Sequence, residues 1–141
     1  MSLDRIFNIA GSALNAQTTR MNTTASNLAN AGTVTGNEAK AFRAKRPMFK
    51  TIIEAQQKVH EQGFAGGVRI EKILDDPSPI RKMSDPANPM ADKNGYVYLA
   101  NVNEMTEMVE MMAAARSYQN NVEVVNTTRQ MLMRTIDIIK T

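Results

Sequence analysis

A chain of 141 residues with no cysteine and a net charge of only +3 is long enough for one domain, or for one domain with extended arms. The lack of cysteine excludes disulfides, thiol catalysis and thiolate metal sites, and the single histidine, His60, lies among polar and charged residues as a solvated side chain does. We find no apolar run long enough to span a membrane and no start typical of a cleaved signal peptide, and we expect no catalytic, cofactor or metal site.

Residues 1–31 predict a long helix whose contact positions repeat every seven residues. One set of these positions is large and the other is small or polar, which lets a partner backbone approach closely along one side. The large set is Phe7, Leu14, Met21 and Leu28, and the small set is Ala10, Gln17, Thr24 and Ala31.

The remainder of this first helix is almost free of charge. Asn8, Asn15 and Asn22 form a polar stripe, and short uncharged side chains surround it. Such side chains can hydrogen-bond inside a crowded interface without burying a charge. We therefore expect protein on several sides of the helix. The alternative is an N-terminal arm that is disordered when free and helical when assembled, because Asn, Thr and Ser are poor helix formers.

Residues 32–101 hold all five prolines and six of the seven glycines. This composition predicts a small strand-containing insert that projects from one end of the two helices. Strands are expected at 41–53, 67–74 and 96–99, an extended turn-rich segment at 75–90, and a helical turn or a loop at 54–62.

Residues 102–141 predict the second long helix, since neither glycine nor proline occurs after Gly95. Its apolar positions alternate at spacings of three and four, which is the pattern of a coiled-coil seam. The predicted seam consists of Met108, Met111, Ala115, Tyr118, Val122, Val125, Arg129, Leu132, Ile136 and Ile139.

These elements predict a mainly α protein in which the helices of residues 1–31 and 102–141 pair as a coiled coil around the central insert 32–101. Two helices that bury one stripe each are marginally stable alone, because backbone ordering offsets most of the gain from burial. We therefore expect further packing against neighbours through the methionine-rich positions outside the seam. Ordinary core packing in a compact bundle is the alternative.

Two segments resemble the signatures of bacterial flagellar axial proteins, the family of rod, hook and hook-associated subunits. They are residues 25–31 (ASNLANA) and 117–126 (SYQNNVEVVN). Residues 9–14, 34–36, 88–92 and 94–97 are similar to the proximal rod proteins within that family. One departure is Ala100, where that group usually has proline.

The resemblance implies a structural subunit of the flagellar basal-body rod, the drive shaft in the periplasmic space. Its helices would line the export channel, and the chain would leave the cytoplasm unfolded through the flagellar type III export apparatus without a cleaved signal peptide. Implied partners are other rod proteins, the rod-base adaptor and further copies of the chain in a helical assembly.

The expected assembly interface combines positions carried over from the resemblance with positions of the two seams. The carried-over positions are Ser26, Asn27, Leu28, Asn30, Tyr118, Gln119, Val122, Glu123 and Asn126. The seam positions are Phe7, Leu14, Met21, Met111, Val125, Leu132 and Ile136.

Three other functions remain as alternatives. An enzyme lacks support, since no phosphate-binding glycine loop occurs and the acidic pair Asp75 and Asp76 precedes Pro77 in what reads as a turn. A nucleic-acid-binding module would use the basic segment 40–50, whose cations alternate with Phe42 and Phe49, although an edge strand shows the same alternation. A soluble helical adaptor is the best alternative to a rod subunit.

Overall fold

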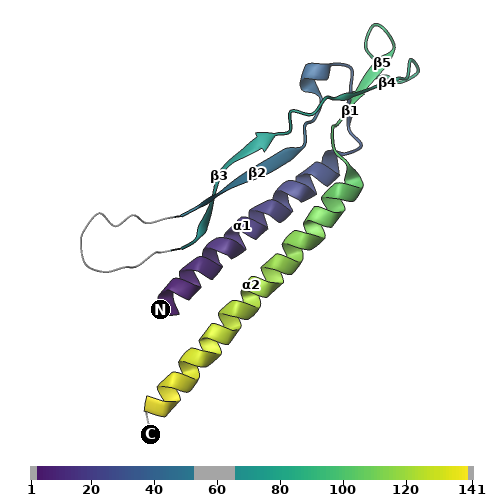
Figure 1. The fold of residues 1–141 in the computed structure, drawn as a ribbon. Helices are drawn as coiled ribbons and strands as arrows, with labels where there is room; N and C mark the ends of the chain where they lie inside the picture. Colours follow the sequence, from purple (N-terminus) through teal and green to yellow (C-terminus); the bar gives the residue numbers. More distant parts are fainter. Residues whose placement is uncertain (1–2, 53–65, 140–141) are drawn as a thin grey trace, which may run out of the picture.

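The computed structural model describes residues 3–52 and 66–139, and two long helices dominate it. Helix α1 spans Leu3–Asn30 and helix α2 spans Glu104–Ile139. The two run side by side in opposite directions, so that the end of α1 lies near the start of α2 (Figure 1). The prediction of two long helices at the ends of the chain is confirmed.

Side chains next to each helix mark where α1 ends and α2 begins. At the end of α1, the amide and hydroxyl of Thr33 both donate to the carbonyl of Asn30, at 3.1 and 2.7 Å. At the start of α2, the side-chain oxygen of Asn103 accepts a hydrogen bond of 3.1 Å from the amide of Thr106, as an N-cap does. Glu104 then places negative charge in the first turn, where the helix dipole favours it.

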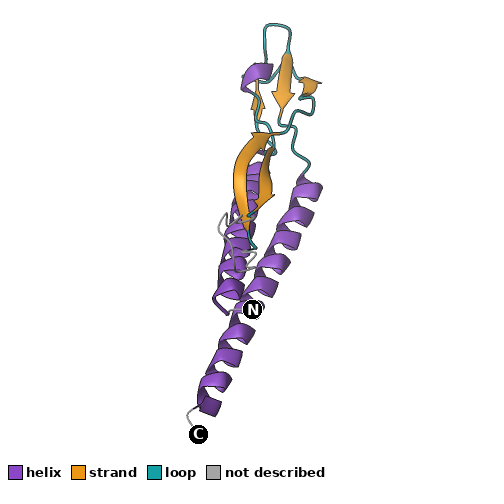
Figure 2. Ribbon diagram, turned by 60° about the vertical axis from the view of Figure 1, so that its left-hand side comes forward, coloured by secondary structure: helices purple, strands orange, loops and turns teal. Residues whose placement is uncertain are grey.

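The central region forms two small antiparallel sheets (Figure 2). The elements are β1 (Val34–Thr35), the short 3₁₀ helix η1 (Glu38–Lys40), β2 (Lys45–Thr51), β3 (Val68–Asp75), β4 (Arg81–Ser84) and β5 (Tyr96–Leu99). One sheet has the strand order β1-β5-β4. The other pairs β2 with β3, from Lys45 opposite Asp75 to Thr51 opposite Val68, with an irregularity after Met48.

Three strands therefore form within the predicted segments 41–53, 67–74 and 96–99, give or take one residue. Strand β4 was not predicted. It lies inside the segment 75–90, is only four residues long, and is exposed at every position, so it carries no alternation of apolar and polar residues. The predicted turn or loop at 54–62 lies outside the described residues.

The insert does not project as a whole from one end of the helices. The sheet β1-β5-β4 lies beyond the helix ends, but the β2–β3 hairpin folds back along α1, on the side away from α2 (Figures 1 and 2). The Ser12 hydroxyl accepts a hydrogen bond of 3.1 Å from the amide of Val68, which holds β3 to α1. Helix α1 is thus covered on two sides within one subunit, whereas the polar stripe Asn8, Asn15 and Asn22, which predicted further packing, is exposed in the subunit.

A small core forms where both helices meet the insert. Ala31, Ala44, Ala100 and Val102 are buried there, with Phe42 packed against them. Their small size lets three segments of backbone come close together. Ala100 donates its amide hydrogen to the carbonyl of Thr33 at 3.3 Å, a bond that the proline expected by resemblance could not make.

The predicted α2 seam is correct at some positions and displaced by one residue at three others. Met111, Tyr118, Val122, Val125 and Leu132 are partly buried as predicted. The fully buried positions are Glu107, Ala114 and Thr128, each one residue before a predicted seam residue, namely Met108, Ala115 and Arg129. The seven-residue repeat persists, but small and hydrogen-bonded residues take positions that an apolar pattern does not select.

Candidate assembly surfaces and the junction of the two arms

A buried polar contact joins the two helices near the end where α1 stops and α2 starts. The side-chain nitrogen of Asn27 donates to Glu107 Oε2 at 2.9 Å, and neither side chain has any exposed surface. The same Asn27 amide group also bonds the backbone of Lys45 in β2, donating to its carbonyl at 3.0 Å and accepting from its amide at 2.8 Å. Asn27 therefore holds α1, α2 and β2 in one place.

Arg46 supplies the positive charge that the buried carboxylate needs. Its Nη1 lies 2.7 Å from Glu107 Oε1, and its Nε lies 3.5 Å from Asp76 Oδ2. A carboxylate without exposed surface is strongly destabilising unless it is paired and hydrogen-bonded. The buried side chain of Glu107 therefore has its partners only while β2 and α1 are both in place.

The segment that follows β3 is tied to the same junction. Asp76 Oδ1 accepts from the amide and the hydroxyl of Ser78, which confirms its predicted turn role. These two bonds, aided by Arg46, hold the pKa of Asp76 below its usual value despite partial desolvation. The carbonyls of Asp76 and Ser78 both accept from the Asn101 side chain, at 3.1 and 3.0 Å, and from Arg43, at 3.2 and 3.0 Å.

We call Asn27, Arg46, Asp76 and Glu107 the junction. Of its members the sequence reasoning selected only Asn27 as a site residue, and assigned it to contacts with neighbouring subunits. The structure places Asn27 wholly inside its own subunit. The sequence reasoning missed Glu107, which lies on the seven-residue register of Ala114 and Thr128, one residue before the predicted seam position Met108.

The expected interface residues of α1 that lie next to α2 or the insert are only partly covered by their own subunit. Phe7, Leu14, Met21 and Leu28 are partly buried, as are Ser26 and Asn30. Asn30 donates to the carbonyl of Ser26 at 2.8 Å within the helix. Each of these side chains keeps some surface that a neighbouring subunit could cover.

The expected interface residues of α2 fall into two groups according to their exposure. Met111, Tyr118, Val122, Val125 and Leu132 are partly buried against the rest of the subunit. Gln119, Glu123, Asn126 and Ile136 are exposed. The first group serves the fold and the second is available to partners.

Helix α2 continues beyond the end of α1 (Figures 1 and 2). The contact between Asn27 and Glu107 marks one level of the antiparallel pair. Leu3, where α1 begins, lies 24 residues before Asn27, and Met131 lies 24 residues after Glu107. The part of α2 after Met131 therefore extends past the start of α1. From Met133 to Ile138 every side chain is exposed. Ile136, a predicted seam residue, is exposed because α1 does not extend far enough to cover it.

Exposed apolar side chains gather near both ends of α2. We call Met105, Met108, Val109 and Met112 the start patch, and Met131, Met133, Ile136 and Ile138 the end patch. Met105 is 75% exposed and Ile138 is 76% exposed. Exposed large apolar side chains gathered in this way mark an interaction site more often than a free surface.

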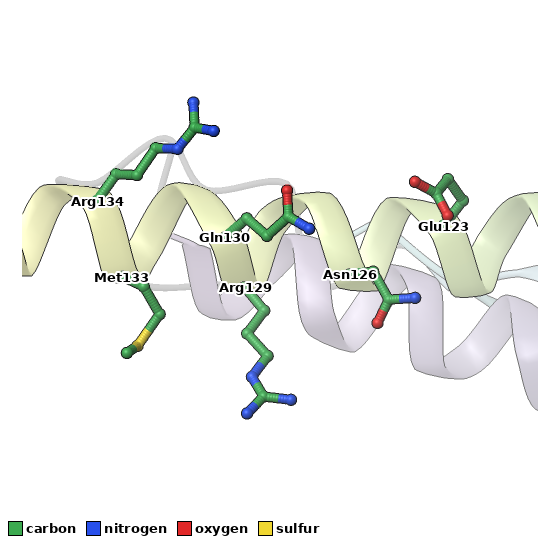
Figure 3. A pocket seen from close by; sticks show the side chains of 6 residues that line it. All are labelled: Glu123, Asn126, Arg129, Gln130, Met133 and Arg134. Atoms are coloured by element: carbon green, nitrogen blue, oxygen red, sulfur yellow. The ribbon is translucent and has the colours of Figure 1, made fainter.

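A depression that lies along α2 alone is open to solvent and does not resemble an enclosed reaction site. It is lined by Glu123, Asn126, Arg129, Gln130, Met133 and Arg134 (Figure 3). Residues 3–52 and 66–139 contain no cluster of three or more His, Asp or Glu side chains suited to a metal ion. Neither described helix is long and apolar enough to cross a membrane.

Most cations of the basic segment 40–50 form ion pairs or hydrogen bonds within the subunit. Lys45 pairs with Asp75 and Lys50 with Glu71, each at 3.2 Å, while Arg46 and Arg43 are held by the contacts described above. A stacking surface for nucleic acid needs cations that face the ligand. This arrangement therefore favours the edge-strand interpretation of the alternating cations.

Two family models and several similar proteins indicate the same family. A family model described as "Flagella basal body rod protein" matches residues 7–36, and one described as "Flagellar basal body rod FlgEFG protein C-terminal" matches residues 93–138. Proteins named flagellar basal-body rod protein FlgC are similar over 98% of both chains. The identity is 47% for that of Yersinia enterocolitica, 46% for that of Buchnera aphidicola subsp. Acyrthosiphon pisum and 44% for that of Salmonella typhimurium.

Proposed function

Since the chain belongs to the FlgC family of flagellar basal-body rod proteins and is a structural subunit of that rod, we propose that it works entirely through its surfaces, without catalysis. Its paired helices act as a coiled coil that packs among other axial subunits around the export channel. The assembled helices transmit torque, and the subunit reaches the periplasmic space through the flagellar type III export apparatus without a cleaved signal peptide.

The observation that carries this proposal is the apolar surface of α2 that its own subunit leaves uncovered. The start and end patches together expose eight large apolar side chains on a single helix. A free monomer rarely exposes so many large apolar side chains on one helix, whereas a subunit within an assembly covers them with neighbours. Other rod proteins, the rod-base adaptor and further copies of the chain are the proposed neighbours.

The outer face of α1 supports the same placement. Asn8, Asn15 and Asn22 are exposed together with Gly11 and Thr18, and none of them is charged. A helix face bound for water normally carries Lys and Glu. Short uncharged side chains suit a face that packs closely against other helices.

The proposal is tested by replacing the chromosomal gene with a tagged copy. The tagged chain should restore swimming and should co-purify with intact basal bodies. A strain that lacks the gene should be non-motile and should lack complete rods in cryo-electron tomograms. Complete rods without this chain, or its absence from purified basal bodies, would overturn the proposal.

A further inference from the structure

We propose that Asn101 is a positioning residue, which fixes the direction of the sheet β1-β5-β4 relative to the paired helices. Its side chain joins three segments of backbone that lie far apart in the sequence. The consequence for assembly rests on the proposed function, because a rod subunit must present its insert to its neighbours in one direction. The positioning itself takes place within a single subunit.

Both functional groups of the Asn101 amide are used. The oxygen Oδ1 accepts a hydrogen bond of 2.7 Å from the amide of Ala44. The nitrogen Nδ2 donates to the carbonyls of Asp76 and Ser78, at 3.1 and 3.0 Å. A side chain at this position therefore needs one acceptor and two donors, which asparagine has and which aspartate and leucine lack.

These contacts lie where the sheet is connected to the rest of the molecule. The described chain enters and leaves the sheet through four connections, which are residues 31–33, 36–44, 76–80 and 100–103. Asn101 belongs to the last of them, and its side chain binds the second through Ala44 and the third through Asp76 and Ser78. Three of the four connections therefore meet at one side chain.

The sheet has little other contact with the helices. Strands β1, β4 and β5 lie beyond the helix ends and make few contacts with α1 or α2, whereas β2 and β3 both lie along α1 (Figure 1). The core at this end consists mainly of the small side chains of Ala31, Ala44 and Ala100, with Val102 and Phe42. The direction of the sheet therefore depends mainly on the hydrogen bonds within its connections.

Arg43 assists Asn101 at the connection between β3 and β4. Its Nη1 donates to the same two carbonyls, at 3.2 Å for Asp76 and 3.0 Å for Ser78. Each carbonyl oxygen thus accepts two hydrogen bonds, which uses both of its lone pairs. The amide of Asp76 also donates to the carbonyl of Ala44 at 2.7 Å. This connection is therefore fixed both to the residues before β2 and to the residues before α2.

Asn27 and Asn101 hold adjacent residues at the start of β2. Asn27 bonds the amide and the carbonyl of Lys45 and fixes the helices to the hairpin, whereas Asn101 bonds the amide of Ala44 and fixes the sheet. The two roles are separable, because the hydrogen-bond partners of the two side chains differ. Loss of the Asn101 side chain should release the sheet while the paired helices stay in place.

A distance measurement between two spin labels tests this role, since the chain has no native cysteine. Lys93→Cys places one label on the exposed turn between β4 and β5, and Ala113→Cys places the other on an exposed position of α2. In the purified full chain we expect one narrow distance distribution by double electron–electron resonance. Asn101→Ala should widen that distribution at least twofold, while the helical signal in circular dichroism is kept.

Asn103→Ala is the matched control. Asn103 lies two residues further along the chain, and its side-chain oxygen caps α2 by accepting a bond of 3.1 Å from the amide of Thr106. Its loss should lower the thermal midpoint, but the bond lies within the start of α2, so the distance distribution should stay narrow. If Asn101 acted on stability alone, both variants would lower the midpoint and neither would widen the distribution.

The positioning role is overturned if Asn101→Ala gives the narrow distribution, or if it loses the helical signal. It is also overturned if the labelled chain without further substitution, or Asn103→Ala, already gives the broad distribution. In each case the sheet would take its direction from something other than the Asn101 side chain.

Assembly gives a second measurement, in strains that carry the unlabelled variants. Asn101→Ala should reduce the amount of chain in purified basal bodies several-fold and should slow swimming, whereas Asn103→Ala should resemble the unsubstituted chain. Normal incorporation of Asn101→Ala would overturn the consequence for assembly. All these outcomes leave the proposed function standing while the unsubstituted chain co-purifies with basal bodies; its absence from them would reject the proposed function and leave the distance measurement to decide the positioning role.

Discussion

Asn27 of α1 and Glu107 of α2 meet with 2.9 Å between amide nitrogen and carboxylate oxygen, 80 residues apart in sequence and without any exposed surface. Arg46 of β2 reaches the same carboxylate. The contact thus joins three elements that lie far apart in the chain. Neither helix can satisfy its buried polar group alone, so the arms and the insert should order together.

Glu107→Ala should destabilise the subunit by about 1–3 kcal/mol, because it removes one acceptor of the buried Asn27 side chain and the ion pair with the partly exposed Arg46. Urea unfolding followed by circular dichroism measures the loss. The control is Glu110→Ala, which removes the partly exposed ion pair between Arg20 and Glu110 and should cost less than about 1 kcal/mol. Equal losses would contradict the role assigned to the junction.

Removing both charges of the junction should cost less than removing one. In Arg46→Met with Glu107→Met, no charge is left buried, and the two apolar side chains fill similar space. We expect the double variant to unfold at a higher urea concentration than Arg46→Met with Glu107 intact or Glu107→Met with Arg46 intact. A double variant as unstable as the sum of the two single variants would show that the charges do not interact.

The sequence predicted the parts of the fold that depend on local pattern. Seven-residue spacing located both helices, and Asn94 with Gly95 before an aromatic run located β5, where Gly95 indeed has a φ of 75°. These features act within a few residues, so a single sequence displays them. The expectation that protein also covers the uncharged face of α1 stays a prediction, because that face is exposed in the subunit.

What the sequence did not predict depends on contacts between distant residues. Glu107 is buried because Arg46 and Asn27 meet it, and no local pattern shows that a charged residue belongs in a seam. The hairpin folds back on α1 through Ser12 and Val68, 56 residues apart. The four assembly residues exposed on α2 stay a prediction, since their neighbours belong to other molecules.

Gly36→Ala should destabilise the end of the molecule that carries β1 and β5. A Cβ atom at residue 36 would lie 2.4 Å from the backbone oxygen of Met90, so the turn before η1 would have to move. We expect a loss of about 1–3 kcal/mol. Gly11→Ala is the control, since a Cβ there meets nothing within 4 Å and should stabilise helix α1 by about 0.5–1 kcal/mol. Thermal unfolding of both variants gives the comparison. A destabilised Gly11→Ala with an unaffected Gly36→Ala would contradict the close contact between Gly36 and Met90.

Acid should weaken the turn before β5. The amide of Tyr96 donates to Asp92 Oδ1 at 2.9 Å and is the main cause that lowers the pKa of Asp92 below its ordinary 3.8, with the amide of Asn94 assisting. Because the folded-state pKa is the lower one, the stabilisation is complete well above pH 3.8 and is lost as the pH falls through the lowered value. Asp92→Asn should reduce the dependence of the urea midpoint on pH in this acid range. An unchanged pH dependence in the variant would exclude Asp92 as a contributor.

The corrected seam of α2 predicts opposite outcomes for two adjacent valines. Val125 is partly buried against the rest of the subunit, whereas Val124 is 46% exposed. Val125→Glu places a charge in the partly buried contact between α1 and α2, where removing a carboxylate from water is costly. We expect loss of helical signal in the purified chain and loss of swimming in the complemented strain. Val124→Glu makes the same chemical change one residue earlier and should leave the fold of the subunit intact, so its circular dichroism should match that of the unsubstituted chain. If Val124→Glu unfolds the subunit and Val125→Glu does not, the face of α2 that meets α1 has been assigned wrongly.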